Sequence, residues 1–291
     1  MAEGGAGLNI LIALAPAFFW GILPLVVSRV GGTPVQQIIG TTVGTLLVSI
    51  VVAMIMPPTL SGTVFWYSFA SGACWAFGQM NQYRSFLQIG VSNAMPVSTG
   101  MQLVSTSLVG VLVFGEWPTL ADKVLGFCAI ALIVLGIYLT THQEGEGHEG
   151  VDMRAGVITL LISTVGYVGY SYFPRAGHID GQDAFLPQAV GMVVMSLVMP
   201  LFFRGSKPFN RKTVQNLLGG FIFAAAALAY LLSAYRNGIA TGFTLSQMNV
   251  VLATLGSIYI LGEKKTRKEM GYVLTGLALV VAGGIMIGLN A

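Results

Sequence analysis

Charged residues in this chain stand in short clusters, and long uncharged stretches separate them. Such stretches lie between Glu3 and Arg29, Arg84 and Glu116, Arg154 and Arg175, Asp183 and Arg204, Lys212 and Arg236, Arg236 and Glu263, and Glu269 and the C-terminus. Each is about as long as a membrane-spanning helix, which needs roughly 20 predominantly apolar residues. The pattern therefore predicts an integral membrane protein.

The overall composition supports the same class. Only 9% of the residues are charged and 55% are hydrophobic, whereas soluble domains carry about 25% charged residues. A membrane β-barrel would show alternating segments of about 10 residues, and the sequence has none. We therefore expect an all-α integral membrane protein.

Turn residues and charges divide the chain into ten expected transmembrane helices. The span from Arg29 to Arg84 is long enough for two helices and is broken at Pro57-Pro58, and the stretch from Lys123 to Glu144 supplies another. The expected helices are 8–28, 35–56, 64–83, a helix within 90–119, 120–140, 155–173, 184–203, 214–235, 239–261 and 270–289.

The sequence contains a weak internal repeat. A shift of 147 positions places Gly115-Glu116 on Gly262-Glu263 and Gly136 on Gly283. The repeat predicts two five-helix halves, 1–142 and 153–291, joined by a Gly-rich acidic linker at 143–152. Because five is odd, the second half must insert inverted, as in alternating-access transporters whose site lies at the repeat interface.

The distribution of Lys and Arg predicts the orientation. With the N-terminus outside, eleven of these residues fall in inner loops and only Lys123, Arg175 and Arg236 fall in outer loops. Because cytoplasmic loops carry an excess of Lys and Arg, both termini are expected outside the cell membrane.

Polar residues within the expected helices are amides, hydroxyls and aromatics, with no ionisable side chain in the middle of a helix. This argues against a charged substrate and against an obvious buried proton carrier. Amides both donate and accept hydrogen bonds, so they suit a ligand covered in hydroxyls. The candidate substrate-binding residues are Gln79, Asn81, Gln82, Gln102, Gln188, Gln247, Trp75 and Tyr167. The alternative is that these side chains hydrogen-bond helices to each other.

Two acidic residues occupy equivalent helix ends in the repeat, Glu116 and Glu263. They are candidates for proton coupling, with helix capping or loop pairing as the alternative. The last helix is rich in Gly and Ala, which suits close helix packing or dimerisation.

The sequence contains no motif that is typical of another class of function. There is no nucleophile–base arrangement, phosphate-binding loop or dinucleotide fingerprint, so we expect neither an enzyme nor a bound cofactor. His142, His148 and His178 lack metal-ligand spacing, and Cys74 and Cys128 lie within expected helices as packing residues. The basic residues stand in short loops and predict no binding to nucleic acid.

Several segments together resemble a known family. They are Phe19-Trp20-Gly21, Gly40-Thr41-Thr42, Cys74–Ser85 (CWAFGQMNQYRS), Gly90–Thr106 (GVSNAMPVSTGMQLVST), Leu161–Tyr170 (LISTVGYVGY), Leu186–Met192 (LPQAVGM), and Ala240–Thr266, which ends in LGEKKT. Together they are similar to the glucose/ribose porter family of the drug/metabolite transporter superfamily, over almost the whole chain.

The resemblance implies a ten-helix importer of monosaccharides in the plasma membrane, with proton-linked transport. Glucose is the first expected cargo and ribose the second, because different segments resemble each branch. Facilitated diffusion, export of a drug or metabolite, and a sugar-sensing membrane protein stay as alternatives.

Overall fold

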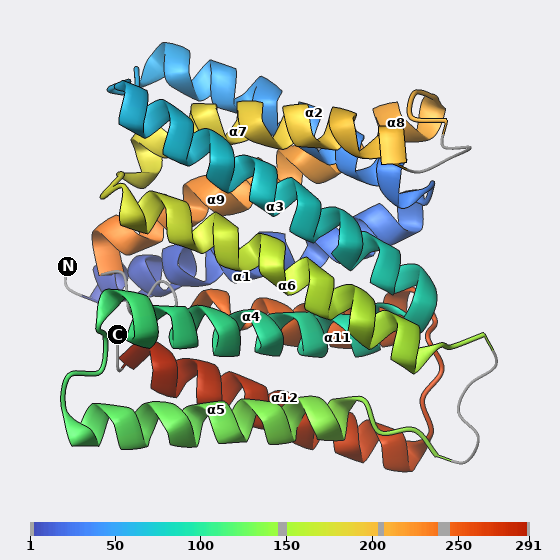
Figure 1. The fold of residues 1–291 in the computed structure, drawn as a ribbon. Coiled ribbons are helices and arrows are strands. Elements are labelled where there is room, and N and C mark those ends of the chain that lie inside the picture. The colour runs from blue at the N-terminus through green and yellow to red at the C-terminus, as the bar shows by residue number, and fades with distance from the viewer. Residues whose placement is uncertain (1–2, 145–149, 203–206, 238–244, 290–291) are drawn as a thin grey trace. The chain divides into compact units, whose positions relative to one another are not determined.

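The computed structural model describes residues 3–144, 150–202, 207–237 and 245–289, and in these ranges the chain forms helices and no strand (Figure 1). The elements in chain order are α1 (Glu3–Val30), α2 (Pro34–Ile55), α3 (Gly62–Ile89), α4 (Val91–Phe114), α5 (Leu120–Thr140), α6 (Met153–Ala176), α7 (Gly181–Val198), the short 3-10 helix η1 (Met199–Phe202), α8 (Arg211–Gln215), α9 (Leu217–Asn237), α11 (Asn249–Ile260) and α12 (Arg267–Leu289). The expected all-α class is confirmed for this part of the chain.

Eight stretches in the described ranges are long and apolar enough to cross a bilayer. They are Leu11–Val30, Pro34–Ile55, Val91–Phe114, Leu120–Thr140, Met153–Ala176, Gly181–Phe202, Arg211–Ser233 and Arg267–Leu289. The protein is therefore a multi-pass membrane protein. Helix α3 contains several amides and is more polar, and the helix expected at 239–261 lies partly outside the described residues, with α11 as its apolar second part.

Two helix boundaries differ from the expected ones for identifiable reasons. The helix expected at 214–235 is α9, preceded by the short α8, and Asn216 separates the two. The Asn216 side chain donates to the carbonyl oxygen of Lys212 one turn earlier (2.9 Å) and to that of Gly31 (3.0 Å). Because Gly31 is distant in the sequence, the role of Asn216 between α8 and α9 depends on a tertiary contact. Helix α3 continues past Arg84 to Ile89 and is followed by Gly90, whose φ of 75° favours glycine.

The helices group into two compact units. Unit 1 comprises Met1–Leu25, Ser85–Val157 and Ala226–Ala291, and unit 2 comprises Val26–Arg84 and Ile158–Ala225. Each unit thus takes helices from both of the expected sequence halves. The halves themselves stay a prediction.

In unit 1, α5 and α12 pack along each other, and α4 contacts α5, α11 and α12 (Figure 1). Glycines bring the backbones of α5 and α12 together: a Cβ added to Gly136 would lie 2.6 Å from the Gly276 carbonyl oxygen. Leu103, Ala129 and Ile133 form the buried core beside this contact. Small residues at helix interfaces are typical of membrane helix packing.

In unit 2, α2 packs against α7 and α8. The hydroxyls of Thr42 and Ser196 are 2.8 Å apart across the α2–α7 contact. Glycine again permits the closest approaches, since a Cβ at Gly72 of α3 would collide with the Gln188 carbonyl oxygen of α7. Gly78 of α3 likewise lets α6 approach closely, since a Cβ there would lie 2.9 Å from the Ser163 carbonyl oxygen.

Candidate functional site

Three of the predicted polar residues form one buried cluster in unit 2. The Tyr167 hydroxyl lies 2.9 Å from Gln79 Oε1 and 3.1 Å from Gln82 Oε1, and Gln79 Nε2 donates to Gln82 Oε1 at 2.7 Å. Each of the three side chains is at most 6% exposed. The cluster contains amide and phenol groups, so it can donate and accept hydrogen bonds without formal charge.

The sequence produces this cluster through helical spacing and close packing. Gln79 and Gln82 stand three residues apart on α3, which places them on one face. Helix α6 approaches that face because Gly78 leaves room for it, and the Ser163 hydroxyl donates to the Gly78 carbonyl oxygen at 2.7 Å. Tyr167 follows Ser163 by one helical turn and so reaches both amides.

The other two predicted residues of α3 have different surroundings. Trp75 is 3% exposed and packs against Phe223 of α9, with ring centroids 4.3 Å apart. Asn81 donates to the Phe77 carbonyl oxygen one turn earlier on its own helix, at 2.9 Å. Trp75 is thus near the cluster in sequence but already has an aromatic partner, and Asn81 has a local hydrogen bond.

Gln188 joins three helices of unit 2. Its Nε2 donates to the Ser71 hydroxyl at 3.0 Å, and Ser71 donates to the Tyr170 carbonyl oxygen at 2.7 Å. These bonds connect α7, α3 and α6. Gln188 therefore makes the interhelical contact that was the alternative to sugar binding.

The remaining predicted amides lie in unit 1 and are half-buried. Gln102 Nε2 donates to the Ser98 hydroxyl one turn earlier on α4, at 3.0 Å. Gln247 Nε2 donates to the neighbouring Ser246 hydroxyl at 3.2 Å. The role of Gln102 and Gln247 in binding stays a prediction.

The two candidate coupling residues lie at helix ends in unit 1. Glu263 accepts hydrogen bonds from the backbone amides of Val91 (2.7 Å) and Ser92 (2.9 Å) at the start of α4. The Glu116 carboxylate lies against Gly110 of α4, near enough that a Cβ there would collide with it. Glu263 thus caps a helix, which was the alternative to proton coupling.

Sequence reasoning missed partners that only the tertiary structure supplies. Tyr83 is fully buried, and its hydroxyl lies 3.1 Å from that of Thr41 on α2. Phe223 covers Trp75, and Lys265 donates to Asn93 Oδ1 at 2.7 Å. Helical periodicity gives the face that a residue occupies, but it does not give the helix that faces it.

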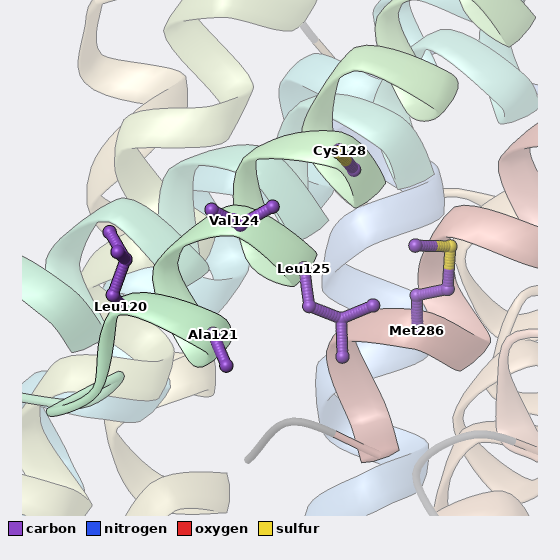
Figure 2. A pocket seen from close by; sticks show the side chains of 6 residues that line it. All are labelled: Leu120, Ala121, Val124, Leu125, Cys128 and Met286. Atoms are coloured by element: carbon purple, nitrogen blue, oxygen red, sulfur yellow. The ribbon is translucent and has the colours of Figure 1, made fainter.

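An apolar groove lies on unit 1 between α5 and α12, with a volume of about 710 Å³ (Figure 2). Its lining residues are Leu120, Ala121, Val124, Leu125, Cys128 and Met286. None of these described lining residues offers an amide or carboxyl side chain to a sugar hydroxyl. The groove is therefore a poor candidate for a sugar site.

Comparisons with known proteins match nearly the whole chain. The sequence model of the sugar transport protein family covers residues 11–290. A Listeria monocytogenes protein named for sugar uptake is 53% identical over 97% of this chain and 99% of its own length. A Latilactobacillus sakei protein named for ribose uptake is 47% identical, over 95% and 96% of the two chains.

A Bacillus anthracis protein named for glucose uptake is 43% identical, over 97% of this chain and 99% of its own length. One solved crystal structure aligns with a TM-score of 0.60 and 16% identity, covering 96% of each chain. At that identity the structural match indicates the fold alone.

Proposed function

Because the chain belongs to the sugar transport protein family, we propose that it imports a neutral monosaccharide across the plasma membrane. Glucose is the first candidate. Ribose is the alternative, because relatives of similar identity carry names for either sugar.

The buried cluster of Gln79, Gln82 and Tyr167 is the observation that carries this proposal. Its hydrogen bonds of 2.7–3.1 Å link two amides and a phenol. A sugar hydroxyl donates and accepts in the same way, so it can insert between two of these groups and bond to both, which leaves neither buried group unpaired. A charged cargo would need a counter-charge, which the cluster lacks.

The other predicted residues complete the proposal. We assign Gln102, Gln188 and Gln247 to hydroxyl recognition together with Asn81, and Trp75 to contact with the apolar face of the sugar ring. Glu116 and Glu263 are the candidate proton acceptors if import is proton-coupled. Facilitated diffusion is the alternative mechanism.

We also propose ten transmembrane helices in two inverted halves, 1–142 and 153–291, with both termini outside. Helix pairing within the units supports this arrangement. α2 packs against α7, α4 against α11, and α5 against α12. In the proposed repeat these are the second, fourth and fifth helices of the two halves, so these counterparts lie side by side, which is compatible with a pseudo-two-fold relation.

Uptake into proteoliposomes tests the function. The purified full chain is reconstituted, and entry of labelled glucose and labelled ribose is compared with entry into protein-free vesicles. The proposal expects faster entry of one or both sugars, competed by the unlabelled sugar. If neither sugar enters faster than into protein-free vesicles, the proposal is wrong.

The same vesicles test coupling. An imposed inward proton gradient should accelerate sugar entry and drive accumulation if transport is coupled. Equal initial rates with and without the gradient, and no accumulation, would identify facilitated diffusion.

A further inference from the structure

The first turn of α4 is bonded to a segment that lies far away in the sequence. The two carboxylate oxygens of Glu263 accept from the amides of Val91 and Ser92, at 2.7 and 2.9 Å and sequence separations of 172 and 171 residues. Lys265 Nζ donates to Asn93 Oδ1 at 2.7 Å. Three consecutive residues at the start of α4 are therefore held by the connection between α11 and α12.

Glu263 takes the place of a missing local cap. A helix usually begins at Ser, Thr, Asp or Asn, whose side chain accepts from the first free amides. Helix α4 begins after Gly90, which has no side chain to do so and adopts φ 75° and ψ 164°. A Cβ on Gly90 would lie 2.8 Å from Glu263 Oε2. The glycine therefore leaves room for the carboxylate, whose negative charge also suits a helix N-terminus.

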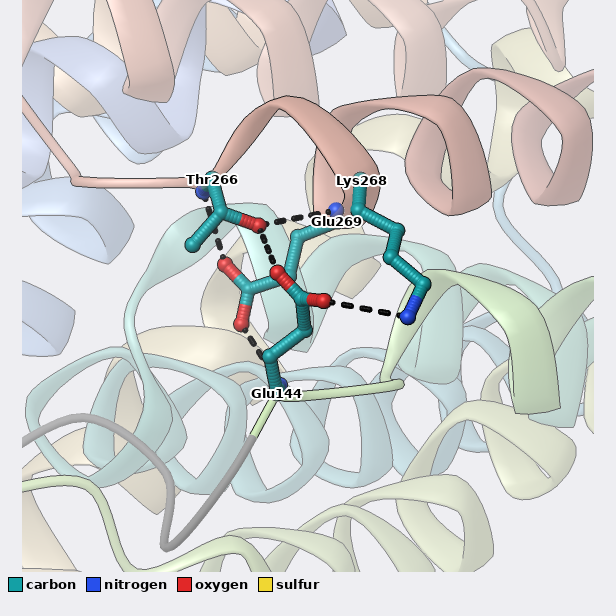
Figure 3. A network of polar contacts seen from close by, with 4 residues as sticks. All are labelled: Glu144, Thr266, Lys268 and Glu269. Carbon is teal, nitrogen blue, oxygen red and sulfur yellow. Dashed lines mark hydrogen bonds and ion pairs between the residues drawn. The ribbon is translucent and has the colours of Figure 1, made fainter.

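The connection that carries Glu263 is itself fixed at the start of α12 (Figure 3). Glu269 is fully buried and accepts from the backbone amides of Thr266 and Glu144, both at 3.0 Å. The Thr266 hydroxyl donates to Glu144 Oε2 at 2.6 Å, and Lys268 Nζ lies 3.2 Å from Glu144 Oε1. The hydrogen bond from Thr266, and then Lys268, lower the pKa of the Glu144 carboxyl. Glu263 is thus presented to α4 from an anchored segment.

We propose that Glu263 is a positioning residue for transport, a helix cap supplied from the second half of the chain that holds the N-terminal end of α4. Only Gly90 separates α4 from α3, so the carboxylate restrains a joint made by a residue with a wide range of allowed backbone conformations. Ser98 and Gln102 stand further along α4, and their location depends on how that helix is held. This inference rests on the proposed sugar transport.

Transport kinetics give the first test. Glu263→Gln keeps the size of the side chain but replaces one accepting oxygen with an NH2 donor. That donor then faces a backbone N–H, so this hydrogen bond is lost. We expect the KM for the transported sugar to rise about tenfold, because the loss of one hydrogen bond to a charged group changes an equilibrium constant by about this factor. Loss of folded protein alone would lower the maximal rate and leave KM unchanged. Asp152→Asn is the matched control, because the hydrogen bond that the described residues give Asp152 Oδ1 is a local one, from the Ala155 amide at 2.9 Å.

Cysteine labelling gives a second test that does not depend on transport. Ser92 is 1% exposed and its hydroxyl has no hydrogen-bond partner among the described residues, so Ser92→Cys can be introduced into a chain with Cys74→Ser and Cys128→Ser. In detergent, Glu263→Gln should raise the rate of maleimide labelling at position 92 about tenfold, since the cap restrains this turn. The Asp152→Asn background should label at the original rate.

The outcomes separate this inference from the proposed function. Unchanged labelling in Glu263→Gln would show that the carboxylate does not hold α4, and faster labelling with an unchanged KM would show that holding α4 is irrelevant to sugar binding. Either result overturns the positioning role. A wild-type protein that transports neither sugar would overturn the proposed function, and labelling would still decide whether Glu263 holds α4.

Discussion

The phenol of Tyr167 has one proton and two amide oxygens within hydrogen-bonding distance, so its removal has a defined consequence. Tyr167→Phe keeps the ring but takes the hydroxyl partner from Gln79 Oε1 and Gln82 Oε1. A buried acceptor left unpaired costs about 1–3 kcal/mol. We expect a lower unfolding temperature and a KM for sugar raised about tenfold or more, measured by intrinsic fluorescence and by uptake. Tyr138→Phe is the control, because Tyr138 is 67% exposed. A wild-type KM in Tyr167→Phe would remove this residue from the proposed site.

Lys265 gives a prediction on pH. Burial lowers the pKa of its ammonium group from 10.5, and the nearby carboxylates of Glu269 and Glu263 offset part of that effect. Between the lowered folded pKa and 10.5 the unfolded chain binds more protons, so stability rises with pH in this alkaline window. Lys265→Met should remove this contribution, so its unfolding temperature should rise less with pH than that of the wild type. Lys264→Met is the control, because Lys264 is the neighbouring lysine and is exposed. Parallel pH profiles for the wild type and Lys265→Met would contradict the prediction.

At the scale of helices, glycine determines how closely α5 and α12 approach. A Cβ on Gly136 would lie 2.6 Å from the Gly276 carbonyl oxygen and 2.9 Å from the Val280 amide nitrogen. Both are backbone atoms, so the helices must separate to admit even a methyl group. Gly136→Ala should therefore lower the unfolding temperature, with an overpacking penalty of about 1–3 kcal/mol.

The matched control for this helix contact lies on α12 itself. Gly271 has open space where a Cβ would stand, and Ala is favoured over Gly inside a helix by about 0.5–1 kcal/mol. Gly271→Ala should therefore leave the unfolding temperature unchanged or raise it. If both substitutions shift the temperature equally, close packing at Gly136 is not what stabilises the pair.

The sequence predicted the helices well because one physical rule dominates in a bilayer. Uncharged stretches of sufficient length must be helical to satisfy their backbone, and this rule located both ends of α2 and α5 to within one residue and the start of α12 to within three. It did not find the break at Asn216, since neither Pro nor Gly marks it and the asparagine side chain binds a carbonyl oxygen of a distant segment.

The candidate site was only partly predictable for the same reason. Spacing placed Gln79 and Gln82 on one face of α3, and the sequence nominated Tyr167 as well. Their mutual bonds depend on α6 packing against Gly78, which periodicity does not specify. The role of Glu263 at α4 likewise follows from tertiary structure, because the capped amides lie in another helix.

For the whole molecule, the distribution of Lys and Arg predicts which ends of the helices face the cytoplasm. In a chain with Cys74→Ser and Cys128→Ser, single cysteines can report each side of the membrane. Gly62→Cys stands at the first residue of α3, in open space, and lies in a predicted outer loop, whereas Lys264→Cys lies in a predicted inner loop. In intact cells, a membrane-impermeant maleimide should label position 62 and should reach position 264 only after permeabilisation. The reverse pattern would place both termini inside and would show that the basic clusters around 204–212 and 264–268 do not determine the orientation of this chain.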